Sequence, residues 1–152
     1  MLGRVNETLV ACIPPNMFVT CFYAILDPKS ATLSYANAGH DLPYLRRHGG
    51  EAEELRARGM PLGLMPGMSY EERGIDLEAG EVVLFYSDGL VEAHDPKGET
   101  FGFPHLRSLV AEHAEGSLGD FLLEELHSFV EEGWEQEDDI TLLTLRRSAS
   151  LS

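Results

Sequence analysis

The sequence predicts an α+β domain with mostly antiparallel strands, and three observations support this fold class. Stretches rich in β-branched and aromatic residues fill the first half and are separated by short turns of Gly, Pro, Asp and Asn. From about residue 104, the apolar residues recur at helical spacing instead. A last apolar stretch, residues 140–145, closes the chain. Strands first, then two helices and one closing strand, are typical of an α+β domain with antiparallel pairing.

The N-terminal third predicts a helix followed by three strands. Apolar residues from Leu2 to Val10 are spaced for one face of a helix over residues 2–12, which the following proline pair ends. The expected strands are residues 17–26, 31–37 and 43–48, with turns at residues 27–30, 38–40 and 49–50. Because one short turn separates the first two strands, we expect them to pair as a hairpin.

The middle of the chain predicts a flap, an edge strand and a buried strand. The segment GMPLGLMPG, residues 59–67, is too apolar for a solvated loop, so we expect it to lie on the domain. Residues 70–77 favour an edge strand, since the charged side chains of residues 71–73 would discourage pairing of an exposed edge. Gly80 then precedes residues 82–86, whose apolar and aromatic side chains predict a fully buried strand.

The C-terminal part predicts two helices and a strand. One apolar stripe covers a helix near residues 104–114. Ser117 and Asp120 resemble a capping box that opens a second helix, whose apolar stripe runs from Phe121 to Val130. Residues 140–145 favour the last strand. With no internal repeat or linker, we expect a single domain over residues 1–147 and a short tail over residues 148–152.

The composition restricts the classes of partner. The chain has 152 residues, which suits one domain with a core, and a formal net charge of −15. This charge argues against nucleic acid or an anionic membrane as a partner, because a polyanion would be repelled. It is compatible with cation binding, although solubility alone is the simpler explanation.

Neither the cysteines nor the apolar runs indicate export or membrane insertion. Cys12 and Cys21 form no metal-binding pattern and suit a reducing compartment. The N-terminus lacks the apolar core of a signal peptide. The longest mostly apolar run, residues 17–26, is far shorter than the roughly 20 residues that span a bilayer. We therefore expect a soluble, cytoplasmic protein.

The stretch VVLFYSDGLVEA, residues 82–93, places a carboxylate directly after the buried strand. Taken alone, Asp88-Gly89 is a strong signal for a tight hairpin turn. Two features also suit a metal ligand: Gly89 permits close approach of another backbone segment, and a buried strand holds its end rigidly. Both interpretations are open at this point.

The stretch EQEDDITLLTL, residues 135–145, repeats this arrangement in reverse order. Asp138 and Asp139 come directly before an apolar strand, although a solvated acidic loop continuing Glu131, Glu132, Glu135 and Glu137 would explain them equally simply. If the two strands are neighbours, Asp88 and Asp138 converge. Carboxylate oxygens are the ligands that Mg²⁺ and Mn²⁺ prefer, and a cation would relieve the repulsion between two aspartates.

A third candidate is YANAGHDLP, residues 35–43, which combines turn-forming residues with a histidine. Asn37 and Gly39 favour a hairpin tip. His40 could line a site, but a lone histidine is more often structural or simply exposed.

Five motifs occur in order along the chain: FVTCFYAILD, YANAGH, MPLGL, LFYSDGLVEA and DDITLL. Together they resemble the C-terminal part of bacterial metal-dependent, type 2C-like protein serine/threonine phosphatases. The stage II sporulation protein E family, which includes phosphatases that regulate stress sigma factors, is the most similar. The resemblance extends from about Leu2 to Arg146. It implies part of an α/β/β/α sandwich with a two-metal centre that holds Mn²⁺ or Mg²⁺.

The resemblance also implies a reaction and a set of site residues. In such enzymes two cations activate a bridging water for in-line attack on a phosphoserine or phosphothreonine, because they lower the pKa of the water and neutralise charge on the phosphoryl oxygens. Substrates of bacterial members are often phosphorylated anti-sigma-factor antagonists. The candidate residues are Asp88 and Asp138 for metal binding and catalysis, Asp139 as a further metal ligand, Gly89 for the turn at the site, and Asn37, Gly39 and His40 for substrate binding.

One family feature does not occur in the sequence. The family carries an earlier segment with Gly-Asp steps, whose aspartates include the residue that bridges the two metals, and the remaining aspartates here lie in turn or helix contexts. We therefore expect a phosphatase domain without its front half, weakly active or inactive alone, that forms a homo-oligomer or associates with a separate N-terminal half. The alternative is a catalytically dead, phosphatase-like module that binds a regulatory protein.

Overall fold

The computed structural model describes residues 1–113, 115–131, 136 and 138–148. Residues 149–152 of the expected tail lie outside this description, as do Glu132, Glu135 and Glu137 of the acidic stretch. Contacts between residues divide the chain into two compact units. The first unit contains Met1–Asp41 and Arg56–Glu78, and the second contains Leu42–Leu55 and Ala79–Ser152.

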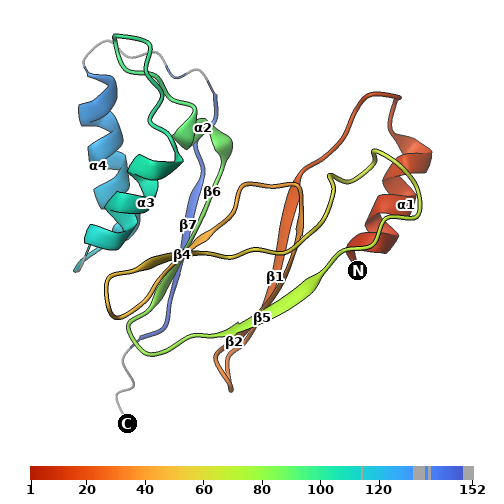
Figure 1. The fold of residues 1–152 in the computed structure, drawn as a ribbon, viewed down its shortest axis with the longest axis horizontal. Helices are drawn as coiled ribbons and strands as arrows, with labels where there is room; N and C mark the ends of the chain where they lie inside the picture. Colours follow the sequence, from red (N-terminus) through yellow and green to blue (C-terminus); the bar gives the residue numbers. More distant parts are fainter. Residues whose placement is uncertain (114, 132–135, 137, 149–152) are drawn as a thin grey trace. The chain divides into compact units, whose positions relative to one another are not determined.

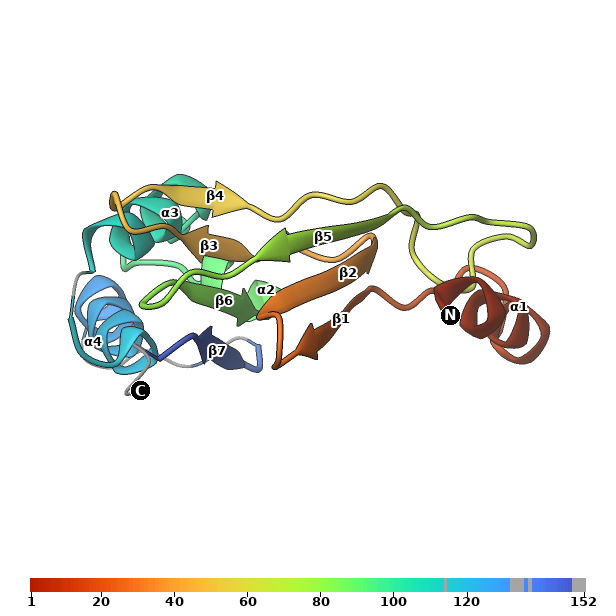
Figure 2. The ribbon, with the colours of Figure 1, turned by 90° about the horizontal axis from the view of Figure 1, so that it is seen from below.

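The first unit contains a three-stranded antiparallel sheet in the order β1-β2-β5. Its strands are β1 (Cys21–Asp27), β2 (Thr32–Ala38) and β5 (Glu72–Asp76). β1 and β2 form the expected hairpin, in which Cys21 lies opposite Ala38, and Figure 2 shows β5 alongside β2. β5 is an edge strand, as its charged residues predicted, and β1 is the opposite edge.

Helix α1 (Leu2–Cys12) has the predicted bounds and is tied to the Gly- and Pro-rich segment, residues 59–67. The buried side chain of Asn6 donates to the Met65 carbonyl (3.0 Å) and accepts from the N–H of Gly63 (2.8 Å). Leu62 is buried and packs in one core with Leu2. The segment is therefore a packed flap, as its apolar composition indicated.

The second unit contains a four-stranded antiparallel sheet and three helices. The strands, in the order β4-β3-β6-β7, are β4 (Ala52–Glu54), β3 (Tyr44–Arg46), β6 (Val82–Tyr86) and β7 (Leu142–Arg146). The helices are α2 (Asp88–Val91), α3 (Phe103–Glu112) and α4 (Leu118–Val130). Figure 1 shows α3 and α4 side by side next to the sheet, and α2 continuing from β6. Leu106 and Leu122 from these helices share a core with Tyr44 and Leu84 from the sheet.

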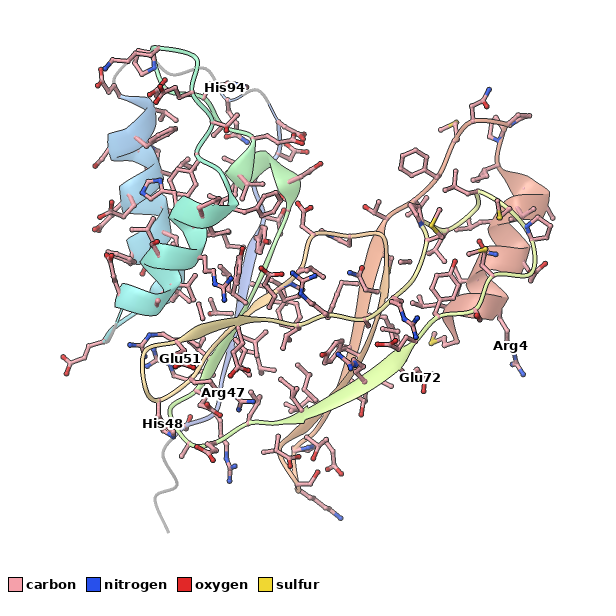
Figure 3. The ribbon with its side chains drawn as sticks, in the orientation of Figure 1. Arg4, Arg47, His48, Glu51, Glu72 and His94 are labelled. Carbon is pink, nitrogen blue, oxygen red and sulfur yellow. The ribbon has the colours of Figure 1, made fainter. Side chains whose placement is uncertain are left out.

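β6 lies inside this sheet, which explains its composition. It pairs with β3 on one side and β7 on the other, and four of its five residues are buried. Strands buried on both faces carry continuous apolar sequences. Just before β6, the buried Glu81 carboxylate forms an ion pair with Arg47 (3.0 Å). Figure 3 shows Arg47 with His48 and Glu51 at the turn of the β3–β4 hairpin.

The α+β class and the antiparallel pairing are confirmed, whereas several bounds were wrong. Residues 17–20 are not part of β1, although they were predicted to be. Asn16, directly before them, has a positive φ of 70°, and Val19 makes only an isolated bridge with Leu62. Ala31, with φ of 55°, belongs to the turn before β2. The structure also differs from the predicted bounds of three other strands and of the first C-terminal helix. The strands predicted at residues 43–48, 70–77 and 140–145 are observed at Tyr44–Arg46, Glu72–Asp76 and Leu142–Arg146. The helix predicted near residues 104–114 is observed at Phe103–Glu112.

Two elements were not predicted. β4 has the sequence AEE, which has low intrinsic β propensity, and it forms because β3 offers a pairing edge. α2 was missed because Asp-Gly indicated a hairpin turn. Across the residues described, no helix combines the length and apolar character needed to cross a membrane.

Candidate metal centre

The pairing of β6 with β7 brings two aspartates together. The strands are antiparallel, with Tyr86 opposite Leu142. The residues that follow β6 therefore lie beside those that precede β7. Asp88 comes two residues after β6 ends, and Asp138 comes four residues before β7 begins. The convergence that the sequence predicted is present in the structure.

The chain after β6 forms a short helix rather than a hairpin loop. Asp88 is the first residue of α2, and Glu92 follows its last residue. Residues four apart on a helix share a face, so the Glu92 side chain lies on the same side as Asp88. One carboxylate oxygen each from Asp88, Glu92 and Asp138 lie within 4.8 Å of one another, and all three residues are exposed. We call these three residues the carboxylate group.

Two small residues allow the segments to approach so closely. A Cβ atom at Gly89 would overlap the carbonyl oxygen of Asp139, a backbone atom that cannot rotate away as a side chain would. Ser87 bridges the same segments, because its backbone N–H donates to the carbonyl of Thr141 (3.0 Å). Its hydroxyl lies 3.1 Å from the Asp139 carbonyl and 2.9 Å from the Thr141 N–H. Close backbone packing therefore requires glycine at position 89.

Among the residues that the structure describes, Asp139 contacts its neighbours through its backbone and not through its carboxylate. Its N–H donates to Oδ1 of Asp138 (2.7 Å), which orients the Asp138 carboxylate. Gln136 donates its side-chain amide to the Asp138 carbonyl (2.7 Å). The Asp139 carboxylate is not part of the group of three, so its role as a further metal ligand stays a prediction.

The carboxylate group has the chemistry of a site for a hard divalent cation. Carboxylate oxygens are preferred ligands of Mg²⁺ and Mn²⁺, and both ions commonly keep several waters. Within the described ranges, neither Asp88 nor Asp138 forms an ion pair with Lys or Arg. Protein cations therefore do not relieve the repulsion between these two residues, whereas a bound ion would. The residues present fit Mn²⁺ or Mg²⁺.

The candidate substrate-binding residues belong to the first unit and lie at the C-terminal end of β2 and just beyond it. The side chain of the buried Asn37 donates to the His40 carbonyl (3.0 Å) and accepts from the His40 N–H (2.9 Å). Gly39 has a φ of 71°, and a Cβ atom there would lie 2.6 Å from the ring of Pro61. These contacts hold the end of β2 and the two residues after it in place, and Ala38 belongs to β2 and not to the predicted turn at residues 38–40. Their role in substrate binding stays a prediction.

Glu92 is the member of the carboxylate group that sequence reasoning missed. Its signal was the spacing of four residues between Asp88 and Glu92, which places two carboxylates on one face of a helix. That signal applies only if residues 88–92 are helical. The Asp-Gly pair instead favours a two-residue turn, and in such a turn Asp88 and Glu92 would share no helix face.

Solved structures identify the class of this fold. The SiaA-PP2C domain of Pseudomonas aeruginosa superposes with a TM-score of 0.75 at 23% identity, covering 95% of this chain and 58% of that chain. The phosphatase domain of the cell fate determinant SpoIIE from Bacillus subtilis, presoaked with Mn, gives a TM-score of 0.73 at 19% identity, covering 99% and 66%. The fold is that of PP2C-type phosphatase domains.

The sequence comparison identifies the family. Residues 1–148 match the family described as stage II sporulation protein E (SpoIIE), and the chain belongs to this family. The phosphoserine phosphatase RsbU of Bacillus subtilis is 28% identical over 149 residues, which cover 97% of this chain and 44% of RsbU. The chain spans less than half the length of the curated relatives that it matches.

Proposed function

We propose that this chain serves in the metal-dependent hydrolysis of phosphoserine or phosphothreonine in a regulatory protein. The observation that carries the proposal is the convergence of Asp88, Glu92 and Asp138 within 4.8 Å at the ends of two paired strands. Membership of the SpoIIE family supports it, since the relative RsbU is named a phosphoserine phosphatase.

In this proposal the carboxylate group holds one Mn²⁺ or Mg²⁺, with Asp139 as a further candidate ligand. Such a cation supplies polarisation of a phosphoryl oxygen and a lowered pKa for a water molecule. The protein's part is orientation: α2 directs Asp88 and Glu92 to one side, and the N–H of Asp139 fixes one oxygen of Asp138. Because the three carboxylates are exposed, water and a phosphorylated segment reach them without a prior opening step.

The proposed substrate class is a phosphorylated regulatory protein. RsbU, at 28% identity, supports a phosphoserine substrate. The motif resemblance adds anti-sigma-factor antagonists as the expected kind of protein. The segment at residues 37–40, with the half-buried His40, is the candidate contact for such a substrate.

We further propose that the chain alone is at most weakly active. In the part of the chain that the structure describes, one group of three carboxylates lies close enough together to hold a metal ion. Three oxygen donors fill half of one octahedral shell. A centre with two cations roughly 3.5–4 Å apart needs further donors that bridge both ions. Full activity therefore requires ligands from another segment or chain.

Two sheet edges are candidate places for that association. β1 is an edge of the first-unit sheet, and β7 is an edge of the second-unit sheet. Each exposes a large apolar side chain, Ile25 on β1 and Leu143 on β7. Exposed apolar edges tend to pair with another strand, so we propose self-association or docking of a separate segment. Light scattering should give a mass above 16.8 kDa that rises with concentration, and a monomer at micromolar concentration would count against this.

Release of phosphate from a phosphoserine protein tests the catalytic proposal. We expect slow, Mn²⁺-dependent release that EDTA stops and that falls at least about 10-fold in Asp88→Asn and Asp138→Asn. Asp120→Asn is the matched control, because Asp120 is an exposed aspartate on α4 and lies outside the carboxylate group. No turnover with any divalent metal by the folded chain would instead favour the phosphatase-like binding module.

A further inference from the structure

Ser87 connects the two segments that carry the aspartates of the carboxylate group. It is the residue between β6 and α2, directly before Asp88. Its hydroxyl donates to the carbonyl of Asp139 (3.1 Å) and accepts from the N–H of Thr141 (2.9 Å). Its backbone N–H donates to the carbonyl of Thr141 (3.0 Å). One residue thus makes three hydrogen bonds to the segment that directly follows Asp138.

These hydrogen bonds lie where the regular strand ladder stops. The register between β6 and β7 ends at the pair Tyr86 and Leu142. Beyond that pair, residues 138–141 are not in a regular strand, and the Ser87 contacts hold them against residues 87–89. The approach is tight, because a side chain at Gly89 would overlap the Asp139 carbonyl. A small displacement of either segment would therefore change the separation of the Asp88 and Asp138 carboxylates.

Electrostatic repulsion acts on the same separation. Three carboxylates lie within 4.8 Å of one another, and like charges at this distance push the two segments apart. The net strength of a hydrogen bond and the repulsion between two exposed charges are similar in size. Loss of the two bonds made by the Ser87 hydroxyl would therefore shift the balance toward a wider, less ordered group.

We propose that Ser87 is a positioning residue for the cation site, whose hydroxyl sets the separation between the carboxylates of Asp88 and Asp138. This inference rests on the proposed cation-binding function. It goes beyond that function because it assigns part of the cation affinity to a hydroxyl that acts through the two backbone segments and not as a ligand. Hydrogen bonds made directly to metal ligands commonly change metal affinity by roughly 10- to 100-fold when they are removed, and we expect the indirect effect of Ser87 to lie at the lower end of this range.

The chemical requirement at this position is specific. The side chain must donate to a carbonyl and accept from an N–H at the same time, and a hydroxyl does both. Threonine keeps the hydroxyl, alanine removes both bonds, and cysteine keeps the size with much weaker bonds. The series Ser87→Thr, Ser87→Ala and Ser87→Cys therefore separates hydrogen bonding from volume.

Mn²⁺ affinity measured by titration calorimetry on the 152-residue chain, at a temperature where each variant is folded, tests the inference. We expect Ser87→Ala to weaken binding roughly 10-fold and Ser87→Thr to stay within about 3-fold of the wild type. Ser117→Ala is the matched control. It removes a serine hydroxyl that accepts the Asp120 N–H (3.2 Å) at the start of α4, so it should lower stability and leave Mn²⁺ affinity unchanged.

The outcomes separate this inference from the proposed function. If Asp88→Asn weakens Mn²⁺ binding and Ser87→Ala does not, Ser87 has no positioning role although the cation site is real. If Asp88→Asn also binds like the wild type, or the wild type does not bind, the cation site and the Ser87 role both fail. If Ser87→Ala does not fold, Ser87→Cys replaces it in the same comparison. Faster hydrogen exchange of the Thr141 amide in Ser87→Ala, and not in Ser87→Thr, is expected as an independent readout.

Discussion

The two ends of β6 both carry acidic side chains, which differ in burial and in their pairing with Lys or Arg. Before the strand, Glu81 is 1% exposed, and Arg47 lies 3.0 Å from its carboxylate. After the strand, Asp88 joins Glu92 and Asp138 in solvent. Among residues with described positions, no Lys or Arg forms an ion pair with Asp88 or Asp138.

The difference shows how burial decides what an acidic residue can do. A buried carboxylate needs a partner supplied by the fold, since an uncompensated buried charge is strongly unfavourable. Exposed carboxylates can remain close together without one and bind a cation from solution. Substitutions near Glu81 should therefore change folding stability, whereas substitutions in the carboxylate group should change cation affinity.

The largest effect is expected for Arg47→Met. The change removes the ion pair with the buried Glu81 and should lower the free energy of unfolding by about 3 kcal/mol, measured by urea denaturation. Mn²⁺ affinity of the folded variant should stay the same. Arg58→Met is the control, since Arg58 pairs with Glu71 at the surface and is 93% exposed, so its loss should have little effect. Equal effects of both changes would contradict the distinction.

Gly89→Ala should affect both stability and cation affinity. The new Cβ atom would overlap the Asp139 carbonyl and force the two segments apart, at a cost of about 2 kcal/mol, with weaker Mn²⁺ binding. Gly119→Ala is the control, because a Cβ atom in α4 meets only Ser117 Oγ at 3.9 Å and alanine favours a helix. Denaturation and calorimetry would measure the two effects, and a stable Gly89→Ala variant with normal affinity would refute the close approach.

Glu92→Gln tests the residue that the sequence prediction missed. We expect about 10-fold weaker Mn²⁺ binding, because the group loses one charged ligand, and unchanged or slightly higher stability in EDTA, because repulsion falls. Glu124→Gln, an exposed change on α4, should alter neither quantity. Thermal unfolding with and without Mn²⁺ measures both, and identical Mn²⁺ shifts in the two variants would exclude Glu92 as a ligand.

The smallest effect concerns acid stability in the first unit. The Arg58 guanidinium, which donates to Glu71 at 2.9 Å, holds the pKa of Glu71 below its ordinary value of 4.5, and Arg73 adds to this. The stabilisation is therefore present above pH 4.5 and is lost as the pH falls through the lowered pKa. Glu71→Gln should slightly flatten the decline in melting temperature between about pH 6 and about pH 3. A steeper decline in the melting temperature of Glu71→Gln than of the wild type would contradict the stabilising effect of the ionised Glu71.

The sequence predicted elements whose patterns are local. The apolar spacing of α1 and the continuous apolar run of β6 specify both elements by themselves, and both have the predicted bounds. Ser117 accepts the N–H of Asp120, as the capping pattern predicted. β4 could not be predicted, because the edge of β3 stabilises a sequence with little strand propensity. The sequence of these three residues does not indicate that they pair with another strand.

Only part of the carboxylate group was predictable, because some of its members depend on local sequence patterns and others on tertiary structure. The meeting of Asp88 and Asp138 follows from two apolar strands that each adjoin an aspartate, once those strands are neighbours. Glu92 lies beside them only because α2 is helical, and the Asp-Gly pair predicted a turn there and not a helix. The bonds of Ser87 depend on the register beyond the strand ends, which no sequence pattern specifies.

The most direct test of the account locates the Mn²⁺ binding site by nuclear magnetic resonance. In an isotope-labelled sample, a small fraction of one equivalent of Mn²⁺ broadens the amide signals nearest to its site. We predict that the signals of Ser87, Gly89 and Asp139 broaden first and that Asp88→Asn abolishes this selectivity. Broadening spread evenly over the acidic surface, or centred on the exposed acids of α4, would show that the carboxylate group does not bind the cation.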